Sequence, residues 1–156
     1  MTNSNYLASR LREVYLNGTW IAYTNYKDQL EKTSWKEAIK QVESLNSIAA
    51  LTYHINYYLD GVLNAFRGGD LEIRDKYSFD LPPINNEAEW LLLVRTFLKN
   101  AEDFIEYVAN FDEDQWQKAF AEEKYGNYLR NIEGVIEHSY YHLGQIVLIK
   151  KLIKRY

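Results

Sequence analysis

The stretch that decides the fold is residues 47–66, SIAALTYHINYYLDGVLNAF, in which apolar side chains recur every three or four positions. The recurring positions are Ile48, Leu51, Ile55, Tyr58, Leu59, Val62 and Phe66. Because an α-helix has 3.6 residues per turn, these side chains form one stripe, which must be buried against other elements. We expect this helix to begin near Asn46 or Ser47 and to end at Gly68-Gly69.

Three further stretches have the same helical periodicity. The first runs from roughly Asn5 to Leu16, and the second runs from a cap at Asn86 to about Ala109. The third runs from about Ile132 to Ile153, with Asn131 as the residue that caps its start. The chain is therefore expected to contain four substantial helices.

The segments between these helices indicate how they are connected. Ser34 and Glu37 form a Ser-x-x-Glu capping box, which marks a helix start ahead of the 47–66 helix. The segment from Asp70 to Asn85 contains the only two prolines and is long for a connection within a bundle. No internal repeat is present. We expect one all-α domain over residues 1–156, an up-down four-helix bundle with a long crossover connection.

Composition limits the classes of function. The chain has 156 residues, of which 47% are hydrophobic, enough for one continuous core. A net charge of -4 argues against a nucleic-acid partner, and the basic cluster from Lys150 to Arg155 suits the dipole of a last helical turn. No cysteine is present, so a metal site must be built from His, Asp and Glu.

No targeting or membrane segment is evident in the sequence. Residues Met1 to Leu11 are polar and lack a secretory apolar core, and no apolar run is long enough to cross a bilayer. The expected compartment is the cytoplasm. The sequence also lacks a Ser-His-Asp arrangement, a phosphate-binding glycine loop and a dinucleotide fingerprint, which leaves the histidines as the candidate chemistry.

Two of the three histidines, His138 and His142, are four residues apart within the predicted last helix. Side chains at this spacing share a helix face with Cβ atoms about 5 to 6 Å apart, so both imidazoles can reach one ion. The pair alone fits ordinary hydrogen-bonded histidines equally well. Ser139 stands where zinc proteases of the thermolysin type have their catalytic glutamate, which argues against a peptidase.

The third histidine, His54, lies at the margin of the apolar stripe in the 47–66 helix. Small residues follow nearly the same line, namely Ser47, Ala50, Gly61 and Ala65. They fit either close helix packing or the wall of a pocket above a metal. Three neutral imidazoles leave coordination positions open, which is typical of a catalytic site. Such an ion could acidify water or a substrate thiol, and the sequence does not choose between them.

These residues resemble a known family. Leu51-Thr52-Tyr53-His54-Ile55, together with a His-x-x-x-His followed by Gly-Gln in the segment from His138 to Gln145, is similar to the DinB-like superfamily of metal-binding helical bundles. The resemblance covers almost the whole chain in helix count, helix order and ligand placement. It implies that His54, His138 and His142 bind one divalent ion, commonly zinc or nickel, with iron or manganese as the other candidates.

The resemblance also implies a class of reaction. Characterised relatives include bacillithiol S-transferases and mycothiol-dependent isomerases or hydrolases, so we expect a thiol transferase or hydrolase acting on a small molecule. A low-molecular-weight thiol is the expected partner, although Leu143 stands where many relatives carry a basic residue. Family members are often homodimers. The alternative is a non-catalytic dimeric bundle that binds a metal or a small ligand.

Three polar side chains close to the histidines in sequence have two interpretations each. Gln145 could orient a ligand ring or a metal-bound water, or it could be an exposed polar residue. Tyr57 and Tyr58 follow His54 by about one turn and could donate a proton to a substrate or pack as core aromatics. No catalytic role is assigned to any of them. Glu137 is predicted to point away from the histidines into solvent.

Overall fold

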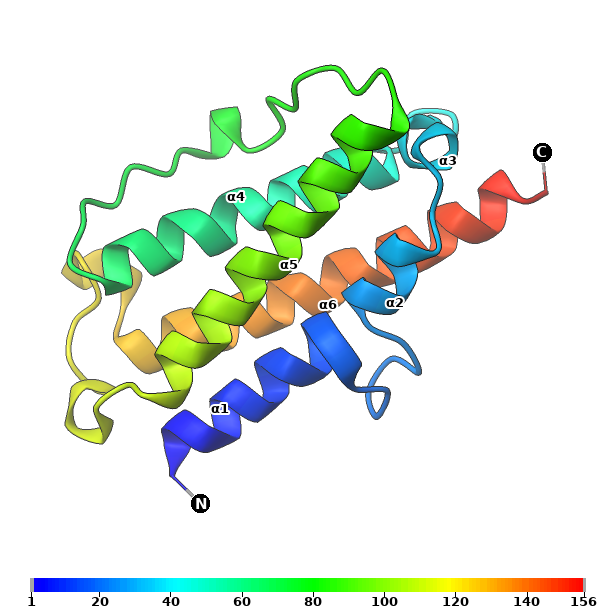
Figure 1. Ribbon diagram of the computed structural model, residues 1–156. Helices are drawn as coiled ribbons and strands as arrows, with labels where there is room; N and C mark the ends of the chain where they lie inside the picture. Colours follow the sequence, from blue (N-terminus) through cyan, green and yellow to red (C-terminus); the bar gives the residue numbers. More distant parts are fainter. Residues whose placement is uncertain (1, 156) are drawn as a thin grey trace.

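The computed structural model describes residues 2–155, which are all-helical. Over this range it contains six α-helices: α1 (Asn3–Arg12), α2 (Tyr26–Glu31), α3 (Trp35–Ile39), α4 (Ile48–Phe66), α5 (Glu87–Ala109) and α6 (Tyr128–Ile153) (Figure 1). A π-helical segment, Glu13–Asn17, extends α1, and short 3-10 turns occur at Asp75–Tyr77, Glu113–Gln115 and Glu123–Tyr125. Among the described residues there is no β-strand, only an isolated bridge between Ala119 and Asn127. The all-α prediction is confirmed.

The four longest helices lie side by side. α1 contacts α5, α5 contacts α4, α4 contacts α6, and α6 contacts α1. The connection from α4 to α5, residues 67–86, returns along the length of α4, so that α4 and α5 run in the same direction (Figure 1). The short helix α3 packs against α4 and α5, and α2 packs against α5 and α6.

Side-chain caps determine where several helices begin. The Ser47 hydroxyl accepts a hydrogen bond from the backbone N–H of Ala50 at the start of α4, over 3.1 Å. The Asn86 side chain accepts from the backbone N–H of Glu89 at the start of α5, over 3.0 Å. The predicted capping box of Ser34 and Glu37 is present at the start of α3. Each of these caps contributes about 1 kcal/mol to helix stability.

The predicted start of the last helix, with Asn131 as its cap, is wrong. α6 begins one turn earlier at Tyr128, and its cap is Asn127, whose side chain accepts from the backbone N–H of Arg130 over 2.8 Å. Asn131 lies within the first turn, where its side-chain amide donates to two backbone carbonyls. The additional turn is stabilised by tertiary packing, because the ring of Tyr128 packs against that of Phe66, with ring centroids 5.2 Å apart.

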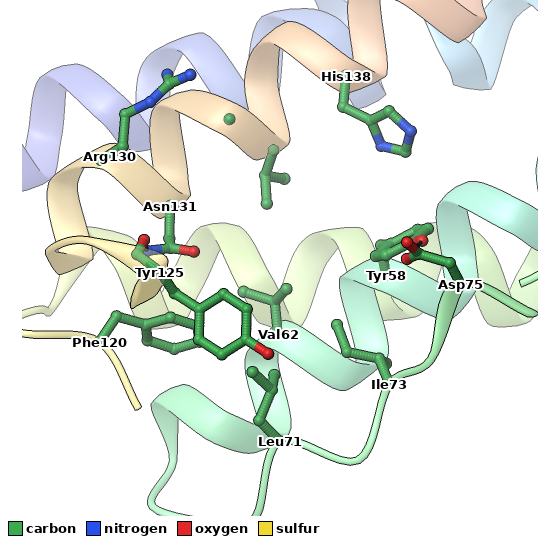
Figure 2. A pocket seen from close by; sticks show the side chains of 12 residues that line it. Tyr58, Val62, Leu71, Ile73, Asp75, Phe120, Tyr125, Arg130, Asn131 and His138 are labelled. Carbon is green, nitrogen blue, oxygen red and sulfur yellow. Dashed lines mark hydrogen bonds between the residues drawn. The ribbon is translucent and has the colours of Figure 1, made fainter. Parts of the chain in front are cut away.

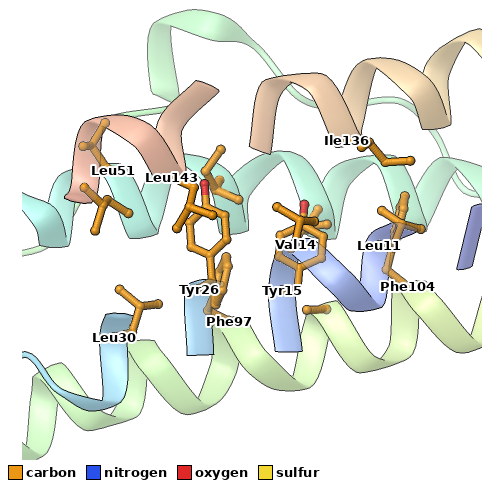
Figure 3. Packing of buried hydrophobic residues seen from close by; sticks show 14 of the residues in the cluster. Leu11, Val14, Tyr15, Tyr26, Leu30, Leu51, Phe97, Phe104, Ile136 and Leu143 are labelled. Atoms are coloured by element: carbon orange, nitrogen blue, oxygen red, sulfur yellow. The ribbon is translucent and has the colours of Figure 1, made fainter. Parts of the chain in front are cut away.

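The buried apolar side chains form one cluster, to which all four long helices contribute. Figure 3 shows Tyr15, Tyr26 and Phe97 among the aliphatic side chains of this core. Tyr26 reaches the core from α2, a helix that the sequence analysis did not predict. Lys150, expected only to complement the dipole of α6, is buried and donates to the backbone carbonyl of Gln29 over 2.8 Å, which ties α2 to α6. In the described part of the chain, no helix combines the length and apolar character needed to span a bilayer.

Candidate metal centre

The three histidines meet at the contact between α4 and α6. The Nε2 atom of His138 lies 3.2 Å from Nε2 of His54 and 2.9 Å from Nε2 of His142. One nitrogen of each ring lies within 4.8 Å of the other two. Two nitrogen ligands at about 2.0 to 2.1 Å from one ion, at angles of about 90 to 110°, are about 2.8 to 3.4 Å apart. The two separations from His138 therefore fit ligands of a single ion, and the third pair of nitrogens is also close.

Helix geometry and core packing together create this convergence. His138 and His142 are one turn apart on α6, and their ring centroids are 4.5 Å apart. His54 and His142 are buried, and His138 is partly exposed. Since the apolar stripes of α4 and α6 both face the core, residues at the margins of the two stripes meet where the helices touch. The structure thus brings together all three predicted residues, and metal binding by them stays a prediction.

Burial keeps the three imidazoles neutral. Desolvation is the largest cause and, together with the nearby His142, lowers the pKa of His54 to about 4 and that of His138 to about 4. Desolvation also lowers the pKa of His142, partly offset by a hydrogen bond to Gln145. Neutral imidazole is the form that binds metal ions, so at neutral pH the cluster presents ligands that need not first lose a proton.

Gln145 determines which nitrogen of His142 faces the cluster. Nδ1 of His142 lies 2.6 Å from Oε1 of Gln145. An amide oxygen can only accept, so Nδ1 carries the proton and the lone pair of Nε2 is directed at the other histidines. The structure supports a role for Gln145 in orienting the ring of His142.

The cluster is incompletely satisfied as a hydrogen-bonded group. Nδ1 of His54 is buried and has no hydrogen-bond partner among residues 2–155, although the backbone of Ser78 lies beside this ring. A single proton on Nε2 of His138 cannot fully satisfy the two short contacts that this atom makes. A cation between the rings would satisfy all three lone pairs at once, which is why the donor set fits a metal better than a hydrogen-bonded cluster.

The connection between α4 and α5 forms one wall of the site. Phe79 stacks on the ring of His54, with centroids 4.1 Å apart and planes inclined by 10°. The ring of Tyr58 lies edge-on to those of His54 and His138, at centroid distances of 5.1 and 5.3 Å. Its hydroxyl donates to the Asp75 carboxylate over 2.5 Å. Burial, followed by the interaction with Asp75, raises the pKa of Tyr58 to about 12, so this hydroxyl stays protonated.

The remaining polar candidates lie away from the cluster. The Tyr57 hydroxyl accepts from the backbone N–H of Arg74 over 2.8 Å and donates to the carbonyl of the same residue over 3.2 Å. Tyr57 therefore holds the connection against α4, and Tyr58 is the one of these two tyrosines that adjoins the histidines. Glu137 is exposed and forms an ion pair with Arg130 over 3.1 Å, so its predicted orientation toward solvent is confirmed.

A groove of about 620 Å³ leads away from His138. His138, Tyr58 and Asp75 lie at one end, and Phe120 and Tyr125 lie at the other (Figure 2). The walls between the two ends are apolar and include Val62, Leu71, Ile73 and Val135. This volume is within the usual range for small-molecule sites.

Sequence reasoning missed the residues that the long connection between α4 and α5 brings to the site. Asp75 and Phe79 are far from the histidine pair in sequence, and no local pattern links them to it. Their proximity depends on the connection folding back over α4, for which the only sequence signal was the unusual length of the segment.

Known proteins do not add to this description. Searches of protein-family models, of curated proteins and of solved structures found no match to the chain. The interpretation of the site therefore depends on its own geometry, in which three neutral imidazoles from two helices converge at one end of an apolar groove.

Proposed function

We propose that His54, His138 and His142 bind one divalent metal ion in an enzyme of the DinB-like type. The observation that carries this proposal is the convergence of three Nε2 atoms from α4 and α6, at separations of 2.9 and 3.2 Å for the two shortest pairs. Zinc and nickel are the expected metals because both are well suited to imidazole ligands, whereas manganese prefers oxygen. Iron is also compatible with imidazole.

The arrangement of helices supports the four-helix bundle that belongs to this proposal. The contacts of α1, α5, α4 and α6 close into a ring, in which each of these helices touches two others. The connection over residues 67–86 runs the length of α4 (Figure 1), as a crossover connection in a bundle does. In this interpretation, α2 and α3 are additions within the connection between the first and second bundle helices.

The expected reaction is thiol transfer or hydrolysis on a small molecule. When bound, the ion would supply Lewis acidity, which lowers the pKa of a water or a thiol and yields a nucleophile near neutral pH. The side chains around the site orient the histidine rings and shield them from water. Gln145 holds His142 in one tautomer, and Phe79 shields one face of the His54 ring from water. The Tyr58 hydroxyl keeps its proton, which it donates to Asp75, and Tyr58 lines the groove, where its oxygen can accept a hydrogen bond from a substrate.

The competing function is a non-catalytic one, in which a metal ties α4 to α6 or captures a small ligand. A structural metal site has four protein ligands and is closed to solvent. Within the described residues, the group of candidate ligands has three members and opens at His138 into the groove. These two features favour the catalytic proposal.

The proposal is tested by measuring metal content on protein purified without a metal-affinity tag. Mass spectrometry should find near-stoichiometric metal in the wild type, and none in His54→Ala or in the double variant His138→Ala/His142→Ala. The matched control is Glu137→Ala, an exposed position on the same helix, which should keep its metal. Circular dichroism confirms that each variant remains helical. A wild type that binds none of zinc, nickel, manganese or iron when they are offered would overturn the proposal.

A further inference from the structure

Two glycines shape the groove beside His138, for different physical reasons. Gly61 lies on α4 under the connection, where a Cβ atom would overlap the side chain of Ile73. The absence of a side chain at Gly61 therefore lets Ile73 pack close to α4 and form part of the groove wall. This accounts for one of the small residues that the sequence placed on the same line as His54.

Gly134 is different because nothing packs against it. Apart from its chain neighbours and the nearby backbone of α6, no atom lies within 4 Å of the position that its Cβ would occupy, and its φ is negative. Neither close packing nor backbone conformation thus requires glycine here, although glycine is among the least favourable residues inside a helix. Gly134 lines the groove one turn before His138, on the same face of α6. The space left by its missing side chain is part of the groove.

The chemistry of the groove is uneven along its length. Charged groups lie at the ends, with Asp75 beside Tyr58 at one end and Arg130, which is exposed and paired with Glu137, at the other. The walls between them are aliphatic or aromatic, as the residues named above show. The side-chain amide of Asn131 already donates to two backbone carbonyls. Between the two ends the groove therefore offers a ligand mainly apolar contacts.

We propose that the groove binds an uncharged apolar tail, alkyl or aryl, of a substrate whose polar head lies at the three histidines, and that Gly134 is the residue that admits this tail. The part concerning the head rests on the proposed function, whereas the part concerning the tail rests on the groove alone. The substrate class is therefore a small amphipathic molecule with a metal-binding head.

The test uses zinc-loaded protein and two hydroxamic acids that share a head and differ in tail length. Each buried methylene strengthens binding about fourfold at full burial, and about twofold in a groove open on one side. Calorimetry should therefore show octanohydroxamate binding to the wild type at least about tenfold more tightly than acetohydroxamate. Gly134→Leu should abolish this gain and leave acetohydroxamate affinity within about twofold, because a helical leucine side chain leans toward the preceding turn, away from His138.

The matched control is Gly144→Leu. Gly144 also lies on α6, and apart from its chain neighbours and the nearby helix backbone no atom lies within 4 Å of the position of an added Cβ, but it does not line the groove. This variant should keep the gain from the longer tail. Equal affinities of the two hydroxamates for the wild type, or a gain that survives Gly134→Leu, would overturn the proposal. A polyhydroxylated thiol that binds more tightly than an alkyl thiol of similar size would also overturn it.

A second measurement separates failure of this inference from failure of the metal site. Titration of metal-free protein with 1-hexanol should shift the methyl resonances of Val62, Leu71 and Ile73 in the wild type and in Gly144→Leu. The same titration should leave them unchanged in Gly134→Leu. If the protein binds no metal but these shifts occur, the proposed function is wrong and the apolar groove stands. If the shifts are absent from the wild type, the groove does not bind apolar tails.

Discussion

The polar groups buried around Ser139 and those buried around His138 lie next to each other on α6, but they differ in how they are satisfied. Ser139 donates to the carbonyl of Val135 over 2.6 Å and accepts from the Tyr15 hydroxyl over 2.5 Å. Tyr26 donates to the carbonyl of Ser139 over 2.7 Å. Every hydroxyl proton in this group has an acceptor.

The histidine cluster is different. Its three Nε2 atoms lie close together, and a single proton on Nε2 of His138 cannot satisfy both of the short contacts that this atom makes. A closed network such as that of Ser139 rigidifies the core, whereas an open set of acceptors is suited to binding a cation. The comparison therefore predicts that substitutions in the first group change stability and that substitutions in the second change metal affinity.

The largest effect is expected from removing a metal ligand. His54→Ala should lower zinc affinity more than about 100-fold, because the loss of a ligand exceeds the 10- to 100-fold loss typical of residues that only support one. Competition titration with a zinc-sensitive chelator measures this affinity. The neighbouring Tyr53→Phe is the control and should bind zinc like the wild type. If the affinity of His54→Ala stays within a few-fold of that of the wild type, the ligand set is not the one proposed.

A smaller effect is expected from removing the residue that orients His142. Gln145→Ala should weaken zinc binding about 10- to 100-fold, because Nδ1 of His142 loses its acceptor and the ring can turn. Gln145→Glu keeps an acceptor at this position, so its affinity should equal or exceed that of the wild type. If the wild type, Gln145→Ala and Gln145→Glu bind zinc with equal affinity, Gln145 has no orienting role.

The buried histidines also predict how stability depends on pH. The pKa of His54 and that of His138 are about 4 in the folded protein, below their ordinary value of 6.5, so the unfolded chain binds protons more readily. Stability of the metal-free protein should be fully present above pH 6.5 and decline as the pH falls toward about 4. Urea denaturation at a series of pH values measures this decline.

The matched variant for this pH dependence is His54→Phe/His138→Phe, which cannot take up these protons. Its stability should vary less than that of the wild type between pH 6.5 and about 5, a range above that in which most carboxylates titrate. An equally steep decline in the variant would assign the pH dependence to other groups.

The smallest effect is expected in the closed network. Tyr15→Phe removes one hydroxyl, but Ser139 keeps its bond to Val135, so the free energy of unfolding should fall by only about 1 kcal/mol. Zinc affinity should stay within about twofold of that of the wild type. Tyr6→Phe, at an exposed position of α1, is the control and should change neither quantity. A large loss of zinc affinity in Tyr15→Phe would mean that the two groups are coupled through α6.

The sequence by itself predicted the features that depend on neighbours along the chain. The stripe of α4, the caps at Ser47 and Asn86 and the capping box at Ser34 follow from helical periodicity and from the unpaired N–H groups at a helix start. The pairing of His138 with His142 follows from the same periodicity. Local geometry is sufficient for all of these features.

The tertiary structure decided what depends on contacts between distant segments. His54 could be placed at the margin of its own helix, but only packing of α4 against α6 sets its distance to His138. The path of the connection over α4 brings Phe79 and Asp75 to the site. Packing of the Tyr128 ring against Phe66 lets α6 begin one turn earlier than the sequence predicted. Burial of apolar surface drives these contacts, and it does not specify which segments pack together. Sequence periodicity shows which face of a helix is buried, but not which distant segment covers that face.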